Sequence, residues 1–175
     1  MDLKPTIRAI ADYPKPGIIF RDVTTLMGDP KAFAHVVTLL AEAHKGQDIQ
    51  KIAGIEARGF VFGAALADRL GLGFIPVRKL GKLPAETYKQ SYKLEYGEDS
   101  LEIHQDAVEA GEKVLIIDDL LATGGTVGAA AKLLHHVKAD LVGAAFVVEL
   151  PELGGREHLT SMGIDVLSLI EFEGH

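Results

Sequence analysis

Two adjacent carboxylates followed by a loop of small residues are the feature of this sequence best suited to chemistry. Residues 114–126 read V-L-I-I-D-D-L-L-A-T-G-G-T, a pattern that predicts a buried strand, two acids at its carboxyl end and a loop that opens a helix. Small residues let backbone N–H groups approach a ligand, and a helix N-terminus adds unpaired donors and partial positive charge. We therefore predict an anion site for a phosphate monoester. Its residues are Ala122, Thr123, Gly124, Gly125 and Thr126.

The two carboxylates, Asp118 and Asp119, suit a different part of the same ligand. They would repel a phosphate, but they can accept hydrogen bonds from sugar hydroxyls or contact a hydrated Mg²⁺. Phosphate, diol and cation together describe a phosphorylated sugar. The familiar nucleotide loops are missing, since the Gly-Lys pair at 81–82 precedes Leu83 and the glycines at 71 and 73 lack a third. The alternative is that the two acids merely end a strand and cap a turn.

A second turn offers the same kind of anion site, because it also follows a predicted strand and opens a helix. Its arginine can bind phosphate oxygens through two parallel hydrogen bonds. Three further cations stand within five residues with no acid between them. The alternative for each of these side chains is an ordinary solvated surface. The turn consists of Glu56, Ala57, Arg58 and Gly59, and the three cations are Arg78, Lys79 and Lys82.

The elements that must position these groups alternate between strand and helix. Asp29 and Pro30 predict the N-cap and first position of a helix that ends near Gly46, and Gly71 predicts the end of a second helix. Continuous apolar strands separated by helices indicate a parallel sheet covered on both faces, with ligands at the carboxyl ends of its strands. The predicted strands span residues 52–55, 74–77, 114–117, 141–148 and 166–170.

Residues 87–104 have a different pattern. Apolar and polar side chains alternate on both sides of Gly97, which predicts an antiparallel hairpin. Three of the four tyrosines lie between 88 and 96, so the hairpin is amphipathic and could close over a ligand as a lid. Glu95 and Tyr96 stand at its tip. The alternative is a solvated hairpin tip.

Composition narrows the classes of protein. A chain of 175 residues fits a single domain, residues 1–175. Without Cys it has no thiolate site, and the histidines show no metal-ligand spacing. We expect a cytoplasmic protein without a membrane partner, because no signal peptide or run of about 18 apolar residues occurs. The net charge of −7 argues against a nucleic-acid partner.

The net charge of −7 comes mostly from one segment. Between Glu95 and Asp119 stand nine carboxylates and only one basic residue, Lys113. Three of the nine, Glu95, Asp118 and Asp119, have predicted roles in the site. The other six we interpret as a solvated hairpin and turn.

The segment with two acids and the T-G-G-T loop resembles the phosphoribosyl-pyrophosphate (PRPP) motif of the type I phosphoribosyltransferases. The resemblance implies an α/β fold: a central, mostly parallel sheet flanked by helices, a small N-terminal hood and a flexible antiparallel hairpin lid. It implies that Asp118 and Asp119 hold the ribose hydroxyls and that residues 122–126 cradle the 5′-phosphate. It also implies that residues 56–59 and the three cations bind pyrophosphate, with a non-proline cis peptide in that turn.

Three further segments, residues 13–22, 78–84 and 91–97, are similar in this order to the members of the family that act on adenine. This similarity implies a purine salvage enzyme, a homodimer, that converts adenine and PRPP to AMP and pyrophosphate. It also implies Mg²⁺ held mainly by PRPP and water rather than by the protein. A purine can stack on the ring of Phe20, and a base on an aromatic side chain is worth about 1–3 kcal/mol. The alternative for a lone Phe is ordinary core.

The same similarity implies residue roles around the base. Ile19 and Arg21 would contact the edge of adenine through their backbones, Glu95 would act as acid or base toward it, and Tyr96 would cover the sugar. Arg58 would act on the departing pyrophosphate. Members that act on 6-oxopurines usually carry Asp where this chain has Ala122, which disfavours hypoxanthine and guanine. A PRPP-binding regulatory protein without turnover, and an enzyme for another base, are the remaining alternatives.

Overall fold

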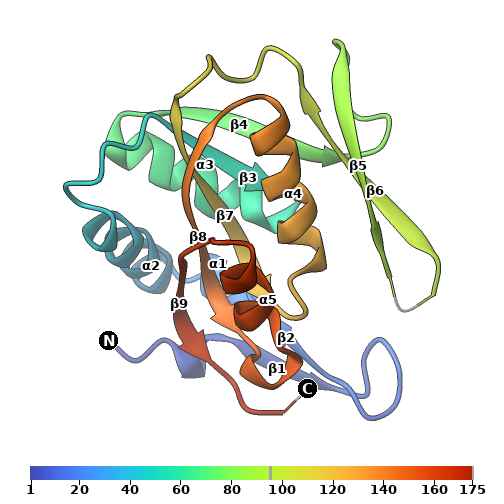
Figure 1. Ribbon diagram of the computed structural model, residues 1–175. Coiled ribbons are helices and arrows are strands. Elements are labelled where there is room, and N and C mark those ends of the chain that lie inside the picture. Colours follow the sequence, from blue (N-terminus) through green and yellow to red (C-terminus); the bar gives the residue numbers. More distant parts are fainter. Residues whose placement is uncertain (95, 175) are drawn as a thin grey trace.

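A seven-stranded sheet forms the centre of the computed structural model, which describes all residues except 95 and 175 (Figure 1). A separate two-stranded sheet lies near the N-terminus. The strands are β1 Arg8–Ala11, β2 Ile19–Asp22, β3 Lys51–Ile55, β4 Gly73–Lys79, β5 Thr87–Lys93, β6 Glu98–His104, β7 Lys113–Leu121, β8 Asp140–Glu149 and β9 Val166–Glu171. The helices are α1 Thr24–Met27, α2 Pro30–Ala43, α3 Arg58–Leu70, α4 Gly125–His136 and α5 Gly155–Ser161, with short 3₁₀ turns η1 Lys4–Thr6 and η2 Pro151–Leu153.

The strand order of the large sheet is β5-β6-β4-β3-β7-β8-β9. Strands β4, β3, β7, β8 and β9 pair in parallel, as their continuous apolar runs predict. The predicted hairpin is confirmed: β5 pairs antiparallel with β6 from Thr87 opposite His104 to Lys93 opposite Glu98. Strand β6 also pairs antiparallel with the end of β4 at Arg78 and Lys79, so the hairpin extends the sheet directly beside two of the predicted cations.

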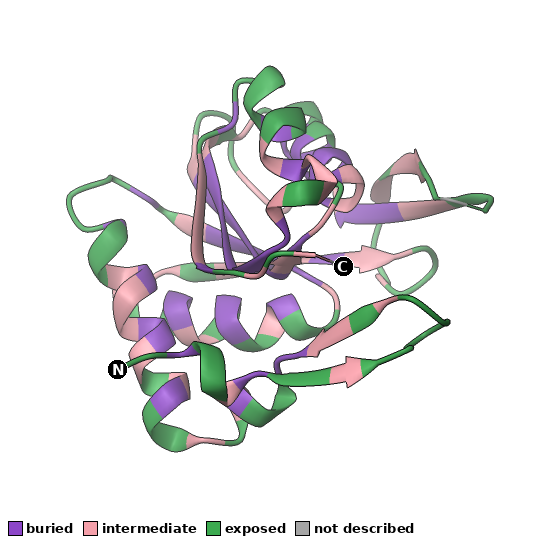
Figure 2. Cartoon of the chain, turned by 90° about the horizontal axis from the view of Figure 1, so that it is seen from below, coloured by how far each residue is buried: buried purple, intermediate pink, exposed green. Residues whose placement is uncertain are grey.

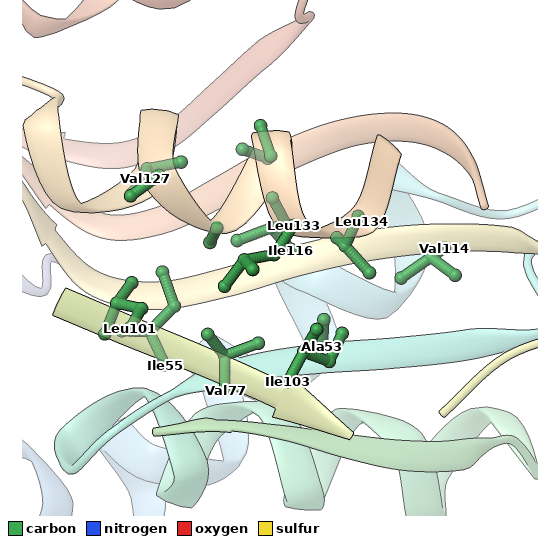
Figure 3. Packing of buried hydrophobic residues seen from close by; sticks show 14 of the residues in the cluster. Ala53, Ile55, Val77, Leu101, Ile103, Val114, Ile116, Val127, Leu133 and Leu134 are labelled. Carbon is green, nitrogen blue, oxygen red and sulfur yellow. The ribbon is translucent and has the colours of Figure 1, made fainter. Parts of the chain in front are cut away.

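Helices cover both faces of the sheet (Figure 1). On one face, α2 and α3 bury apolar side chains such as Val36, Leu40, Phe62 and Leu66. On the other face, α4 packs on strands β5, β6, β7 and β8, and Figure 3 shows Val127 and Leu134 in the buried cluster beneath it. Buried residues therefore concentrate in the strands and on the inner sides of the helices (Figure 2).

Local signals set most helix ends. The side chain of Asp29 accepts hydrogen bonds from the backbone N–H groups of Lys31 and Ala32, and Pro30 begins α2 as predicted. Helix α3 ends at Gly71, whose φ of +71° is the left-handed conformation that favours glycine. The prediction that Gly46 closes α2 is wrong by a few residues, because the helix ends at Ala43 with His44 as its C-cap.

The predicted N-terminal hood is an antiparallel hairpin of β1 and β2. It is fastened by Asp22, whose carboxylate accepts hydrogen bonds from the hydroxyl and backbone N–H of Thr24 and from Arg8. These contacts, those of Thr24 first, lower the pKa of Asp22 from 3.8 to about 2. The end of the hairpin carries residues 18–21 toward the carboxyl ends of the central strands.

The acidic segment is less solvated than expected: the interpretation of its six remaining acids is wrong for Glu102, and two others form ion pairs while partly exposed. Glu102 is buried and accepts hydrogen bonds from the Gly81 backbone and the Thr87 hydroxyl. Asp99 pairs with Lys79, and Glu112 lies 3.0 Å from the ammonium of Lys51. The sequence pattern could not show this, because these partners come from other strands. Within the described part of the chain, no helix has both the length and the apolar character that a membrane span requires.

Candidate active site

The carboxyl ends of β3, β4 and β7 border a cavity of about 350 Å³. Segments far apart in the sequence meet in its wall. Of the described residues predicted for the site, Gly59, Arg78, Lys82 and Tyr96 are not part of the lining. The lining residues are Ile18, Ile19, Phe20, Arg21, Glu56, Ala57, Arg58, Lys79, Asp118, Asp119, Leu120, Leu121, Ala122, Thr123, Gly124, Gly125, Thr126, Val127 and Leu150.

The two acids lie inside the last part of β7, which continues to Leu121, rather than beyond the strand's end. Both are buried, at 8% and 6% exposure. Asp119 accepts a hydrogen bond from Nε of Arg58 at 2.5 Å, whereas Asp118 accepts the backbone N–H of Asp119 at 2.8 Å. Burial, and then the neighbouring charge of Asp119, raise the pKa of Asp118 well above its ordinary value.

Gly59 lets α3 begin against this pair. A Cβ at Gly59 would lie 2.8 Å from Oδ1 of Asp118 and 3.0 Å from the carbonyl oxygen of Ile117. Any side chain there would push α3 away from β7 and carry Arg58 with it. Gly59 is predicted to bind pyrophosphate, and its position against β7 gives a steric reason for glycine here.

The small-residue loop leads from β7 into α4. Gly124 is the N-cap of α4 with φ of +87°, and among the described residues no side chain caps this helix end. The first N–H groups of α4 therefore lack a side-chain partner and face the same cavity as Asp118 and Asp119. Thr123 and Thr126 add hydroxyl donors to the lining. The arrangement can bind a phosphate group beside a diol.

The second turn lies across the cavity from this loop and contains the predicted non-proline cis peptide, between Glu56 and Ala57. Ala57 is the N-cap of α3, again without a side-chain cap. The carboxylate of Glu56 is occupied by other partners and cannot itself bind an anion. It accepts hydrogen bonds at 3.0 Å from Nε of Arg78 and from the backbone N–H of Lys79. Glu56 thus holds the end of β4, while Arg58 and Lys79 supply the cations of the lining.

Lys79 connects the cavity with the hairpin. Its ammonium group pairs with the carboxylate of Asp99 on β6 and lies 3.4 Å from the hydroxyl of Tyr92 on β5. The hydrogen bond that Lys79 donates to Asp99 outweighs partial burial and raises the pKa of Lys79. A ligand anion that takes up this ammonium must therefore compete with Asp99.

The predicted base platform, Phe20, is also part of the cavity lining. The ring of Phe20 is half-buried. Its centroid lies 5.2 Å from that of Tyr13, in an edge-to-face arrangement, and 5.9 Å from the guanidinium of Arg58. The side chain of Arg21 turns to the ring of Phe172, at 4.3 Å. An aromatic face beside a cationic site suits a flat heterocycle next to an anion.

The tip of the hairpin meets the loop between β1 and β2. The ammonium of Lys15 lies 5.6 Å from the ring centroid of Tyr96, which is otherwise 83% exposed. Lys15 and Tyr96 thus bring the tip of this hairpin into contact with the N-terminal hairpin, and its closure over a ligand stays a prediction. The predicted acid/base residue Glu95 lies outside the described residues.

Several lining residues were missed in the sequence: Ile18, Leu120, Leu121, Val127 and Leu150. Four of them adjoin predicted site residues, so proximity to the motifs was the available signal. Leu150 follows the predicted strand 141–148, and the rule that ligands bind beyond the carboxyl ends of parallel strands could have found it.

Helices cover both faces of a mostly parallel sheet, and two helix N-termini and an acid pair surround one cavity. These features define the class of protein as a phosphoribosyl transferase. The model of the phosphoribosyl transferase domain family matches residues 22–167, so it covers most of the chain. The structure supports the predicted type I fold, with its mixed seven-stranded sheet and N-terminal hairpin.

Relatives narrow the class further. The chain is 58% identical to the adenine phosphoribosyltransferase of Parvibaculum lavamentivorans over 175 residues, the whole of both chains. It is 55% identical to that of Rhizobium meliloti, over 99% of this chain and 97% of the relative. The crystal structure of adenine phosphoribosyltransferase from Thermoanaerobacter pseudethanolicus superimposes with a TM-score of 0.93 at 54% identity, covering 97% of this chain and 98% of that one. The chain belongs to the adenine phosphoribosyltransferases of the type I family.

Proposed function

We propose that the protein transfers the phosphoribosyl group of PRPP to adenine, giving AMP and pyrophosphate in purine salvage. The observation that carries the proposal is one cavity that joins the N-termini of α3 and α4, a buried acid pair between them and an aromatic face. These parts match pyrophosphate, 5′-phosphate, ribose diol and base. In the reaction a bond forms between a ring nitrogen of adenine and the anomeric carbon, the bond to pyrophosphate breaks, and adenine loses a ring proton.

The phosphate and ribose end follows from the acid pair and the loop. The backbone N–H groups of residues 123–126 and the start of α4 would bind the 5′-phosphate. Asp118 and Asp119 would accept hydrogen bonds from the ribose hydroxyls, and each such bond to a charged group contributes about 1.5–3 kcal/mol. Because Arg58 holds Asp119 in the structure, binding of PRPP would let this guanidinium pass from the carboxylate to the pyrophosphate.

The leaving group would be bound by the turn at residues 56–58 and by the cations around it. Arg58 and Lys79 line the cavity directly, while Arg78 stands behind Glu56 and Lys82 on the exposed loop after β4. Stabilisation of the charge that develops on pyrophosphate, together with fixed orientation of the reactants, would supply most of the rate acceleration.

Mg²⁺ would enter with PRPP. Among the described residues no group of three or more metal-ligating side chains occurs, but Mg²⁺ in proteins is commonly bound by one or two carboxylates with substrate phosphates and water. Asp118 and Asp119 fit that role through water, so that PRPP and water hold the cation. The cation would supply charge neutralisation of the pyrophosphate group.

Adenine would stack on Phe20, with the backbones of Ile19 and Arg21 at its edge. Ala122 lies in the lining and carries no carboxylate, in keeping with a base that is not a 6-oxopurine. Glu95 stays the predicted proton acceptor, and Tyr96 the predicted cover of the sugar. We also propose a homodimer, as the resemblance implies, supported by the exposed apolar side chains of Ile19 on β2 and Leu80 after β4. Sedimentation at micromolar concentration tests it, and a monomer would refute it.

The direct test compares four bases with PRPP and Mg²⁺: adenine, hypoxanthine, guanine and orotate. Formation of AMP from adenine at a rate far above that of the other three products is the expected result. If another base is turned over in preference to adenine, that base would be the substrate instead of adenine. Binding of PRPP with no product from any base would favour a regulatory protein instead.

A further inference from the structure

A partly buried ionic cluster lies outside the cavity, next to the loop at residues 122–126, which we call the phosphate loop. Its centre is the carboxylate of Glu149 at the end of β8, which is only 2% exposed. The guanidinium of Arg156 donates to both of its oxygens, at 2.6 to 3.2 Å, and the hydroxyl of Ser168 donates at 2.7 Å. None of these three described residues belongs to the cavity lining.

Each of the three guanidinium nitrogens of Arg156 donates at least one hydrogen bond. Besides Glu149, its Nη1 donates to the carbonyl oxygen of Val166 at 3.0 Å and its Nη2 to the hydroxyl of Ser168 at 3.1 Å. Burial alone would disfavour the carboxylate of Glu149, but the hydrogen bonds from Arg156 and Ser168 outweigh it and lower its pKa. The cluster therefore stays ionised and ties the start of α5 to β8 and β9.

The residue before Arg156 locks the same helix to the phosphate loop. A Cβ at Gly155 would lie 2.4 Å from the carbonyl oxygen of Ala122 and 2.7 Å from Cδ1 of Leu121. A Cβ at Gly124, in turn, would lie 3.2 Å from the carbonyl oxygen of Gly155. The first turn of α5 and the loop thus touch backbone to backbone, and a shift of one moves the other.

The pairing of β7 with β8 links the carboxylate of Glu149 to the phosphate loop. Leu121 lies opposite Glu149 in the sheet, and the N–H of Leu150 donates to the carbonyl oxygen of Leu121 at 2.9 Å. The loop at residues 122–125 is therefore held on one side by the strand that carries Glu149 and on the other by the helix that carries Arg156.

We propose that Arg156, held by Glu149 and Ser168, is a positioning residue for the 5′-phosphate. It fixes the start of α5, and Gly155 transmits that position to the backbone N–H groups of residues 123–125. The inference rests on the proposed function, because it concerns ligands that carry a ribose 5-phosphate. A displacement of about 1 Å in such a site can cost a hundredfold in rate.

The test compares Arg156→Lys and Gly155→Ala with the wild-type protein. Lys keeps the charge but cannot reach three partners as a planar fork, and Ala pushes on the carbonyl of Ala122. We expect a rise of about tenfold or more in the KM for PRPP and in the Kd of AMP, with the Kd of pyrophosphate changed less than twofold. Arg69→Lys, at an exposed arginine bonded to Thr38, and Gly73→Ala, where a Cβ meets only Lys51 at 3.6 Å, are the matched controls.

A merely structural role has a different signature. It would lower the melting temperature and the active fraction while leaving the KM for PRPP and the Kd of AMP unchanged in the folded protein, and that result would overturn the inference. Equal losses for AMP and pyrophosphate would also overturn it. If the wild-type protein itself fails to bind AMP or to turn over adenine, the proposed function fails instead, so the two failures are distinguishable.

Discussion

Replacing Asp118 by Asn is expected to make the unliganded protein more stable and a weaker binder of PRPP. The carboxyl is buried, at 8% exposure, and accepts a hydrogen bond from the backbone N–H of Asp119. Burial and the adjacent charge of Asp119 raise its pKa well above 3.8. Asn has the same shape, keeps an oxygen that accepts the N–H, and removes the buried charge.

The sign and size follow from the pKa. Below pH 3.8 the carboxyl is protonated in both the folded and the unfolded chain, so it carries no electrostatic cost. As the pH rises, the unfolded chain ionises first and the folded chain loses relative stability until its own raised pKa is passed. Each unit of elevation corresponds to about 1.4 kcal/mol, so Asp118→Asn is expected to stabilise by about 1 kcal/mol or more at neutral pH.

Urea unfolding of both proteins between pH 4 and pH 8 measures this difference. The stability gap should be small at pH 4 and grow toward pH 8, whereas Asp68→Asn, at an exposed position on α3, should show no such growth. Calorimetry with PRPP and Mg²⁺ should show affinity reduced about 10- to 100-fold, the loss of one charge-assisted hydrogen bond. A variant that is destabilised at every pH, or that binds PRPP normally, would refute the reasoning.

Three more substitutions test other parts of the structure. Asp22→Asn should lower the unfolding free energy by about 2 kcal/mol at neutral pH, because the pKa of about 2 marks a stabilised carboxylate, and urea titrations should show this loss fading between pH 4 and pH 2. Asp99→Asn should speed hydrogen exchange in the hairpin but cost under about 1 kcal/mol, since the pair with Lys79 is partly solvated. Glu95→Gln should lower kcat by about tenfold or more with little change in PRPP affinity, because it removes a proton acceptor, as steady-state kinetics and calorimetry would show.

Each has an outcome that contradicts it. A stability loss in Asp22→Asn that persists at pH 2 would mean that packing, not charge, holds the N-terminal hairpin. For Asp99→Asn the comparison is Glu98→Gln, an exposed neighbour on β6, and equal exchange in both variants would show that Lys79 does not anchor the hairpin. A change in Glu95→Gln confined to PRPP affinity would remove its acid/base role.

Local chemistry was readable from the sequence where the cause is local. Asp29 and Pro30 begin α2 because a side-chain oxygen and a fixed φ act on adjacent residues. The order of strands and helices follows from apolar periodicity, and the loop at 122–126 lies beside Asp118 and Asp119 because strand, loop and helix are contiguous. The site motifs could be predicted for the same reason.

Only the tertiary structure decided which charges meet. Glu56 and Arg78, Lys79 and Asp99, and Arg58 and Asp119 are pairs drawn from different strands and helices, and nothing in their spacing along the chain reveals them. The raised pKa of Asp118 depends in the same way on burial beneath α3. So does the place of Arg156 behind the phosphate loop, because contact between β8, β9 and α5 arises from the sheet pairing and not from sequence neighbours. The sequence by itself determined which groups this protein has for its chemistry, and packing determined how each group is charged, paired and aimed.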